Sequence, residues 1–561
     1  MVSRFSKSHE AAHNIGIVSL AFHVPGSDER KKGFIMGNAR LGRVLLSGVL
    51  TMLAGAASAQ EHAGAAVDPS KMPKVATVDP LYLSYNVEMV EVTGGRFWKP
   101  YKSAANGGST AKPGAATNSD QQVGSATGPY EYRPPINLSD PRLRNLAKAL
   151  GPSYVRVSGS WANSSFFQNN DDPPLKQVPA GFRQVLTRAE WKGVVEFARA
   201  TGDKLVTSFA ISLGTRNLQG VWTPVQAKAL LDYTKSIGGS IAAAEFMNEP
   251  TFPGPGGAPA GYDAGAFAKD VKVFEPFLRK ESPQTIFLGP GGVMEGGPAM
   301  FGGMKLIHSE DILKATGPVF DALSYHFYGS VSRRCGGNMT VDKAMTANWM
   351  DQVDGNEKFY ADMRNKLMPG KTLWLTETAE AACGGDQLAG EFVDSFRFLN
   401  TLGTLAQKGV QSVMHNTLAS SDYGLLNEDG LEPRPNYWAS LLCNRTMGTG
   451  VLDPGVTDAP GLKVYAQCMV GHKGGVTVLA MNIDPKDEHT LMISKPVDRY
   501  TLTAPELTSQ NIFLNGIALE AAEDGLVPEM KPEQVKAGML QLAPASITFL
   551  MFSSAHNEYC M

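Results

Sequence analysis

Two glutamates stand where short buried strands would end. Glu249 lies in the triplet Asn248-Glu249-Pro250, between an apolar run and a stretch rich in Gly and Pro. Glu377 follows residues 372–376, which are mostly β-branched, aromatic or Leu. Parallel α/β folds carry their chemistry at the carboxyl ends of strands. Two carboxylates that meet there suit the cleavage of a glycosidic bond.

The two carboxyl groups would take different roles. Glu249 is the predicted general acid and later general base, so its surroundings must raise its pKa. Asn248 would offer its amide to the sugar 2-hydroxyl, and Glu377 would act as the ionised nucleophile. Glu380 and Asp386 compete for the nucleophile role through their proximity in sequence. For Glu249, an exposed loop residue after a buried strand is the alternative interpretation.

Polar side chains alternate with aromatic ones in the segment before this strand. Ser324, His326 and Tyr328 share one face of a strand, since successive side chains point to opposite faces. Tyr328 could donate a hydrogen bond to Glu377 and hold it ionised, and His326 could support either carboxylate. His415 is expected at the same mouth, with structural and functional roles equally supported.

These residues require a scaffold that joins distant parts of the chain. Short apolar runs alternate with amphipathic stretches between residues 81 and 416. Strands are predicted at 82–92, 154–159, 204–212, 242–248, 285–289, 322–327, 372–376 and 411–416. Helices are predicted at 141–150, 188–201, 224–237, 264–280, 304–315, 341–367, 390–407 and 436–447. Eight strands that alternate with helices favour a parallel (β/α)8 TIM barrel over an open sheet.

The pattern changes after residue 448. Short β-prone runs are separated by Gly, Pro, Asp and Lys, at 462–467, 475–482, 491–493, 500–503, 512–514 and 547–552. This pattern predicts an antiparallel β-sandwich. The expected domains are therefore a barrel over 80–448 and a sandwich over 449–561, with an added strand from 60–79.

The first 59 residues resemble a secretory signal. Arg40 and Arg43 precede an apolar stretch that ends in Ala57-Ser58-Ala59, so we expect translation to start at Met36 and cleavage to follow Ala59. The apolar stretch is short for a membrane span, although a retained anchor helix is the alternative. We expect a secreted or periplasmic protein without stable membrane insertion once residues 1–59 are removed.

Removal of this segment changes the charge of the chain. Residues 1–59 carry seven basic and three acidic side chains, so the formal net charge falls from -3 to -7. An acidic mature chain is a poor general polyanion binder, and we expect no nucleic-acid partner.

The five cysteines suggest two disulfides and one free thiol. We expect Cys335 to pair with Cys383 and Cys443 with Cys468, although spacing does not fix connectivity. Neither a CxxC nor an HExxH motif is present, so no metal and no organic cofactor are expected.

The strand-end residues resemble the retaining glycoside hydrolases of clan A, and more closely family 79, the β-glucuronidases and heparanases. Four stretches carry the resemblance, which covers roughly residues 80–450: residues 137–159, 369–385, 421–426 and 435–442. It implies a retaining β-glucuronidase that acts on a glucuronide or glycosaminoglycan. It assigns Glu249 as acid/base and Glu377 as nucleophile. The backbone N–H groups of Gly384 and Gly385 and the hydroxyl of Tyr423 would bind the glucuronate carboxylate.

The chain also departs from the heparanase pattern. The segment before the nucleophile strand has only Lys371 in place of a basic cluster, and the loop after the fifth strand carries Glu295. These differences leave exo and endo cleavage comparably supported. The alternatives are another clan A glycosidase, of the β-xylosidase or arabinofuranosidase type, and a non-catalytic carbohydrate-binding protein.

Overall fold

Eight parallel strands form a closed barrel in the computed structural model, which describes residues 65–101, 128–297, 306–456 and 460–561. In order around the barrel they are β3 (Leu83–Glu88), β6 (Tyr154–Ser158), β9 (Lys204–Ser208), β10 (Ile241–Glu245), β11 (Ile286–Gly292), β12 (Ala322–Val331), β13 (Thr372–Ala382) and β14 (Ser412–His415). The predicted (β/α)8 barrel is confirmed. The expected signal region, 1–59, lies outside the described residues.

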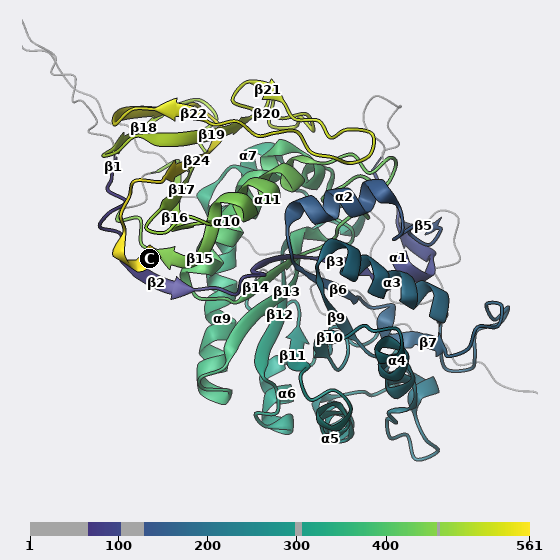
Figure 1. The fold of residues 1–561 in the computed structure, drawn as a ribbon. Coiled ribbons are helices and arrows are strands. Elements are labelled where there is room, and N and C mark those ends of the chain that lie inside the picture. Colours follow the sequence, from purple (N-terminus) through teal and green to yellow (C-terminus); the bar gives the residue numbers. More distant parts are fainter. Residues whose placement is uncertain (1–64, 102–127, 298–305, 457–459) are drawn as a thin grey trace, which may run out of the picture. The chain divides into compact units, whose positions relative to one another are not determined.

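Helices connect the strands along the outside of the barrel, as Figure 1 shows for α4, α5 and α6. They are α2 (Pro141–Leu150), α3 (Arg188–Thr201), α4 (Val225–Ser236), α5 (Ala264–Glu281), α6 (Ser309–Thr316), α9 (Gln352–Leu367), α10 (Phe392–Gln407) and α11 (Pro435–Thr446). Asp140 starts α2, because its side chain accepts hydrogen bonds from the backbone of Arg142 and Leu143. The predicted bounds of α2 and α3 agree with the structure.

Several predicted elements are wrong in extent. The strand expected over 372–376 continues to Ala382 as β13, so Glu377 lies within this strand and not at its end. The strand expected over 82–92 ends at Glu88, where α1 (Met89–Thr93) begins. Glu88 and Glu91 form a capping box, in which the Glu91 carboxylate accepts the Glu88 N–H at 2.8 Å. The helix expected over 341–367 is divided into α7 (Val341–Ala344), α8 (Ala347–Met350) and α9. Side chains of Thr340 and Thr346 cap the first two pieces.

The barrel interior changes from apolar to polar along the strands. One cluster of buried apolar side chains fills the part of the interior nearer the amino ends of the strands. It includes Tyr154, Ala243, Ala322 and Trp374. Side chains of one face recur every second residue. The next inward positions are therefore polar and buried: Arg156, Ser208, Glu245, Ser324, Thr376 and Asn416. The barrel is a packed core that supports a polar site at its carboxyl end.

Two sheets follow the barrel, and apart from one parallel pair at the edge of the smaller sheet their strands are antiparallel, as predicted. A nine-stranded sheet contains β2 (Lys74–Thr77), β15 (Met447–Leu452), β16 (Leu462–Met469), β17 (Val476–Asn482), β19 (Val497–Thr503), β20 (Phe513–Leu514), β21 (Ile517–Ala518), β22 (Glu533–Val535) and β24 (Ser546–Phe552). A three-stranded sheet contains β1 (Ala65–Val67), β18 (His489–Ile493) and β23 (Gly538–Leu542). The strand expected from 60–79 corresponds to β2, whereas β1, β15, β21, β22 and β23 were not predicted.

The large sheet contributes to two hydrophobic cores. Alternate residues of β17 lie on opposite faces of the sheet. Val476, Val478 and Ala480 pack with residues of β18 and β23, whereas Leu479 and Met481 belong to the barrel core. The nine-stranded sheet therefore has one face on the barrel and the other on the three-stranded sheet.

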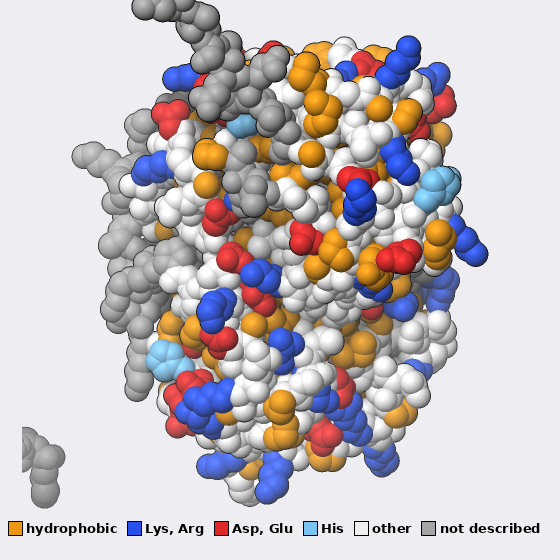
Figure 2. All heavy atoms as spheres, turned by 90° about the vertical axis from the view of Figure 1, so that its left-hand side faces the viewer, with side chains coloured by type: hydrophobic (Ala, Val, Ile, Leu, Met, Phe, Trp, Pro, Cys, Tyr) orange, Lys and Arg blue, Asp and Glu red, His pale blue; other side chains and the backbone are white. Residues whose placement is uncertain are grey.

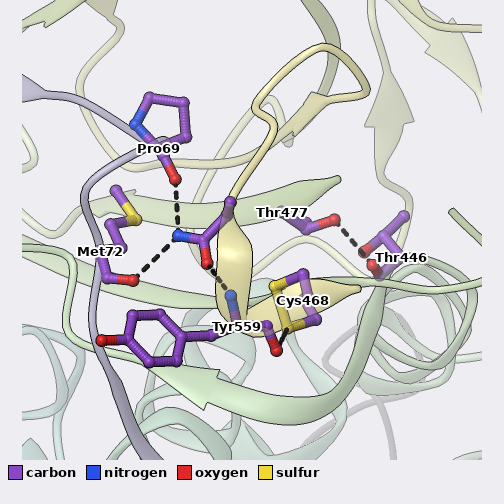
Figure 3. The surroundings of a disulfide bond; sticks show 8 residues. Pro69, Met72, Thr446, Cys468, Thr477 and Tyr559 are labelled. Atoms are coloured by element: carbon purple, nitrogen blue, oxygen red, sulfur yellow. Dashed lines mark hydrogen bonds between the residues drawn. A yellow bond between two sulfur atoms is a disulfide. The ribbon is translucent and has the colours of Figure 1, made fainter. Parts of the chain in front are cut away.

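Two disulfides are present, and one differs from expectation. Cys335 bonds to Cys383 as predicted, but Cys468 bonds to Cys560, so the Cys443–Cys468 prediction is wrong. Cys443 is a buried free thiol in α11, and burial raises its pKa to about 12. Cys468 lies on β16, next to the 3-10 turn Glu558–Cys560, as Figure 3 shows.

Charged side chains of both signs are spread over the face of the molecule that Figure 2 shows. Lys and Arg side chains are interspersed there with Asp and Glu and are not gathered in one basic area. Within the part of the chain that is described, no helix has the length and apolar character needed to cross a membrane.

Candidate active site

Asn248 and Glu249 lie just beyond β10, at the mouth of the barrel. Asn248 is fixed by its backbone, whose N–H and carbonyl each pair with the Asn163 side chain at 2.8 Å. The backbone of Glu249 has a φ of 50°, a left-handed conformation that few non-glycine residues adopt. Neighbouring contacts hold this strained conformation, and such strain is typical of functional sites.

Glu377 accepts a hydrogen bond on each carboxylate oxygen. Tyr328 donates its hydroxyl to Oε1 at 2.6 Å, and Arg156 donates to Oε2 at 2.9 Å. Burial, followed by the nearby Glu377 carboxylate, raises the pKa of Tyr328 well above its usual value, so this hydroxyl stays protonated. Glu377 is thus held in one orientation by two donors.

The two predicted carboxylates are close in space. His326 Nδ1 lies 3.1 Å from Glu249 Oε1 and 3.6 Å from Glu377 Oε2. One carboxylate oxygen of Glu249 and one of Glu377 lie within 4.8 Å of each other. Their side chains are 15% and 7% exposed, so both are largely shielded while Glu249 stays more accessible.

The environment of Glu249 favours its protonated form. Burial raises the pKa of Glu249, and the nearby Glu377 carboxylate adds to this effect, although the His326 hydrogen bond opposes it. For His326, burial lowers the pKa, but the carboxylates of Glu377 and Glu249 outweigh burial and raise it overall. The pair therefore combines an acid with a raised pKa and a carboxylate that is held by two donors.

Arg156 is a central residue that the sequence analysis missed. Its guanidinium donates to Glu245 Oε2 at 2.8 and 3.1 Å, to Glu377, and to Asn248 Oδ1 at 2.7 Å. Burial would raise the pKa of Glu245, but Arg156 and further donors lower it. A charged residue inside the run Val155-Arg156-Val157 was the available signal, because buried charges occur almost only when paired.

A second polar cluster lies beside Glu377. Asn416 Nδ2 lies 3.1 Å from the hydroxyls of Tyr328 and Tyr423 and 3.2 Å from Glu88 Oε1. Burial, with a contribution from Glu377, raises the pKa of Glu88 well above its usual value. Within the described residues, Glu88 Oε2 has no hydrogen-bond partner. This carboxyl oxygen is buried against Gly159, and its sequence position gave no signal.

A glycine turn after β13 forms the wall next to this cluster. Cys383, Gly384 and Gly385 all have positive φ, at 64°, 81° and 78°. Gly384 has no room for a side chain, because a Cβ there would lie 2.5 Å from both Trp98 and Arg334. A Cβ on Gly385 would lie 3.0 Å from the Cβ of Tyr423, which places the turn against that residue.

The amide groups of this turn differ from expectation. The Gly385 N–H donates to the carbonyl of Ala381 at 3.2 Å, so the prediction that it is available for a ligand is wrong for this structure. For the N–H groups of Cys383 and Gly384, no partner is found among the described residues. The N–H groups without a partner among the described residues are therefore those of Cys383 and Gly384, and not those of Gly384 and Gly385 as predicted.

The competing acidic residues, Glu380 and Asp386, lie outside the site. Glu380 is buried on the opposite face of β13, where its carboxyl accepts the Asp386 N–H at 3.0 Å and interacts with Asp394 of α10. Asp386 is buried and accepts the Gln387 N–H at 2.7 Å at the start of the 3-10 turn Gln387–Gly390.

Glu295, in the loop after β11, lines a pocket together with His326 and Tyr328. It accepts hydrogen bonds from Ser309 at the start of α6.

His415 has a structural contact instead of a ligand-facing one. Its Nε2 lies 2.8 Å from the Tyr423 carbonyl, and burial lowers its pKa to about 3. It therefore stays neutral and supports the loop that carries Tyr423.

The only candidate metal ligands among the described residues are Glu249, His326 and Glu377. Arg156 already donates to Glu377 and also lies 3.3 Å from His326. A cation placed between these groups would be repelled by the guanidinium, which does not lose its charge in proteins. The donor set therefore fits proton transfer better than metal binding.

Comparisons with known proteins agree with this site. Residues 134–403 match the model of the glycosyl hydrolase family 79 N-terminal domain. Heparanase-like protein 1 of Arabidopsis thaliana is 26% identical over 499 residues, covering 77% of this chain and 88% of the relative. Hyaluronoglucuronidase of Hirudo nipponia is 26% identical over 471 residues, covering 76% and 92%.

Two further matches limit what the similarity means. Inactive heparanase-2 of Homo sapiens is 26% identical over 406 residues, covering 67% of this chain and 66% of the relative. A GH51 arabinofuranosidase from Xanthomonas axonopodis superposes with a TM-score of 0.58 at 14% identity, covering 87% of this chain and 99% of that one. Proteins with other activities therefore share this barrel fold, so the function must be argued from the residues of the site.

Proposed function

Because the chain belongs to glycoside hydrolase family 79, we propose that it is a retaining β-glucuronidase of the heparanase type. The observation that carries this proposal is the approach of Glu249 and Glu377 to within 4.8 Å in different environments. Retaining glycosidases place their carboxyl groups about 5–5.5 Å apart, whereas inverting enzymes leave about 6.5–9.5 Å for a water molecule.

The reaction would proceed in two displacements. Glu377 attacks the anomeric carbon while the bond to the leaving oxygen breaks, and Glu249 gives its proton to that oxygen. Glu249, now ionised, takes a proton from water, whose oxygen attacks the same carbon and releases Glu377. Two inversions restore the original configuration.

Uronate selectivity would come from the wall formed by the glycine turn and Tyr423. The N–H groups of Cys383 and Gly384 are donors that can face a carboxylate, and backbone donors of this kind suit anions. Burial raises the pKa of Tyr423 well above its usual value, so its hydroxyl remains a donor. Hyaluronoglucuronidase among the relatives supports a glucuronate substrate.

We also infer that the protein is exported, to the periplasm or outside the cell. Two disulfides support this inference, since such bonds persist in oxidising compartments.

The test compares chromogenic β-glucuronide, β-glucoside, β-xyloside and α-arabinofuranoside. The proposal expects hydrolysis of the glucuronide at a kcat/KM at least about tenfold above the others. Glu377→Ala should abolish turnover while the protein remains folded, with a lower thermal midpoint because the buried ion pair with Arg156 is lost. A preference for the xyloside or the arabinofuranoside would contradict the proposal and indicate another clan A activity. Glucuronide binding without turnover by the unmodified protein would indicate a non-catalytic carbohydrate-binding protein.

A further inference from the structure

Arg334, in the 3-10 turn Arg333–Cys335 after β12, contacts the glycine turn from the side of its carbonyl groups. Its Nη1 donates to the carbonyl oxygen of Cys383 at 2.8 Å and lies 3.4 Å from that of Gly385. The side chain of Arg334 is only 9% exposed, so water competes little for these contacts. A buried cation therefore lies directly against the backbone of the turn.

The contact with Arg334 sets the direction of one peptide group. In a trans peptide the carbonyl of one residue and the N–H of the next point in opposite directions. The Cys383 carbonyl points to Arg334, so the N–H of Gly384 points away from it. One peptide earlier, the Ser332 N–H donates to the Ala382 carbonyl at 3.0 Å, so the N–H of Cys383 also points away. These are the two N–H groups of the turn that have no partner among the described residues.

Two further contacts hold the Arg334 side chain in place. Its Nη2 donates to Asp422 Oδ2 at 2.6 Å, and Asp422 directly precedes Tyr423. Its guanidinium carbon lies 4.1 Å from the ring centre of Tyr101, whose hydroxyl accepts the backbone N–H of Arg334 at 3.0 Å. A planar guanidinium donates in several fixed directions at once. Arg334 therefore joins the glycine turn to the loop that carries Tyr423.

The charge of Arg334 also affects how strongly the turn can donate. Hydrogen bonds in a chain polarise one another, so a carbonyl that accepts from a cation makes the N–H of its own peptide group a stronger donor. The Gly384 N–H belongs to the peptide group whose carbonyl accepts from Arg334. A carboxylate gains more from such a donor than a neutral hydroxyl does. Arg334 would therefore favour an anion at this N–H without touching it.

We propose that Arg334 is a positioning residue for the carboxylate of the bound glucuronate. Through the Cys383 carbonyl, it orients the Gly384 N–H toward the ligand and polarises it. Because the carboxylate takes no part in bond cleavage, Arg334 acts on the ground state and the transition state alike. The inference rests on the proposed glucuronidase function, which supplies the carboxylate.

The experiment measures kcat and KM of Arg334→Met on a chromogenic β-glucuronide and on the β-glucoside, which has a hydroxymethyl group in place of the carboxylate. KM for the glucuronide should rise about tenfold and kcat should stay within about threefold, since equal binding of ground and transition states is lost. Both constants for the glucoside should stay within about twofold. Arg334→Lys keeps the charge but not the planar fork, so its KM for the glucuronide should lie between the other two values.

Two further variants separate this role from a loss of stability. Arg334→Met combined with Asp422→Asn leaves no unpaired buried charge, so it carries the test if the single variant does not fold, and it should show the same rise in KM. Arg279→Met is the matched control. Arg279 contacts Asp321 at 2.7 and 3.0 Å and the Val319 carbonyl at 3.3 Å, from α5 on the outside of the barrel. It should change none of the four constants.

Each other outcome overturns the inference. Equal losses on both substrates would assign Arg334 to the fold of the barrel mouth alone. An unchanged KM for the glucuronide in a folded variant would show that the turn needs no cation behind it. In both cases the unmodified protein would still prefer the glucuronide, and the proposed function would stand. A failure of the unmodified protein to cleave the glucuronide would remove the proposed function and this inference together.

Discussion

Glu377 lies opposite His326 in the pairing of β12 with β13 because β13 contains one extra residue just before it. Tyr325 pairs with Leu375, yet the next residue, His326, pairs with Glu377. Thr376 is the additional residue, and its hydroxyl donates to Glu245 inside the barrel at 2.8 Å. Two successive side chains therefore face the interior, which regular alternation forbids. A bulge of this kind redirects a side chain toward an active site.

Arg156→Met should destabilise the fold. The substitution leaves the buried carboxylates of Glu245 and Glu377 without their shared cation, which costs about 3–5 kcal/mol when one partner of a buried pair is removed. Denaturant unfolding measures this change. Lys358→Met is the control, since its pair with Asp362 is exposed and should leave the midpoint unchanged. Equal midpoints for both variants would contradict a structural role of the Arg156 network.

His326→Ala should move the alkaline limb of the pH–rate profile. The acid form of Glu249 is required, so activity falls as pH rises through its raised pKa. The hydrogen bond from His326 opposes that raised pKa, and its loss should shift the limb to higher pH. The profile of kcat/KM on a chromogenic glucuronide measures the shift. A limb that moves to lower pH would show that His326 does not control the ionisation of Glu249.

Glu380 should make stability depend on pH. Burial, then the Asp394 carboxylate, raises the pKa of Glu380 to about 8, while the hydrogen bond from the Asp386 backbone and the charge of Arg397 oppose this shift. The folded protein therefore binds more protons than the unfolded chain between about pH 4.5 and 8, and stability falls as pH rises through this window. Glu380→Gln should flatten the fall, as thermal midpoints at pH 5 and pH 8.5 would show. An equal fall in the variant would assign the pH dependence to other groups.

Loss of the Cys335–Cys383 disulfide should affect selectivity as well as stability. The bond closes 48 residues, for which a chain-entropy estimate gives about 4 kcal/mol. It also holds Cys383 in the glycine turn, so Cys335→Ser with Cys383→Ser should reduce the glucuronide-to-xyloside ratio of kcat/KM. Cys468→Ser with Cys560→Ser is the control, because that bond lies in the β region and should lower the thermal midpoint alone. Unchanged selectivity in the first variant would show that the turn needs no covalent support.

Periodicity predicted most of the scaffold, because helices and buried strands repeat their apolar positions locally. The bounds of α2 and α3 follow from such repeats and from capping side chains. The bulge at Thr376 left no local signal, since it depends on pairing with a distant strand. Arg156 left a local signal, as a charge inside an apolar run, but its partners could not be identified because they lie on other strands of the barrel.

The disulfide error has the same physical origin. Cys443 and Cys468 are near in sequence, but α11 buries the first, while the second faces the returning C-terminus. Conversely, the face shared by Ser324, His326 and Tyr328 was predictable, because β12 is regular where it carries them.

Segments that precede the barrel in the chain pair with segments that follow it. β2, which precedes the barrel, pairs with β15, which follows it, and Asn557 donates to the carbonyls of Pro69 and Met72 at 2.9 Å near the second disulfide (Figure 3). During synthesis β1 and β2 leave the ribosome first, but their partners β18 and β15 follow the whole barrel, so the edges of β1 and β2 stay unpaired while the barrel is made. Truncation of one end would therefore leave the segment that pairs with it at the other end exposed and unpaired.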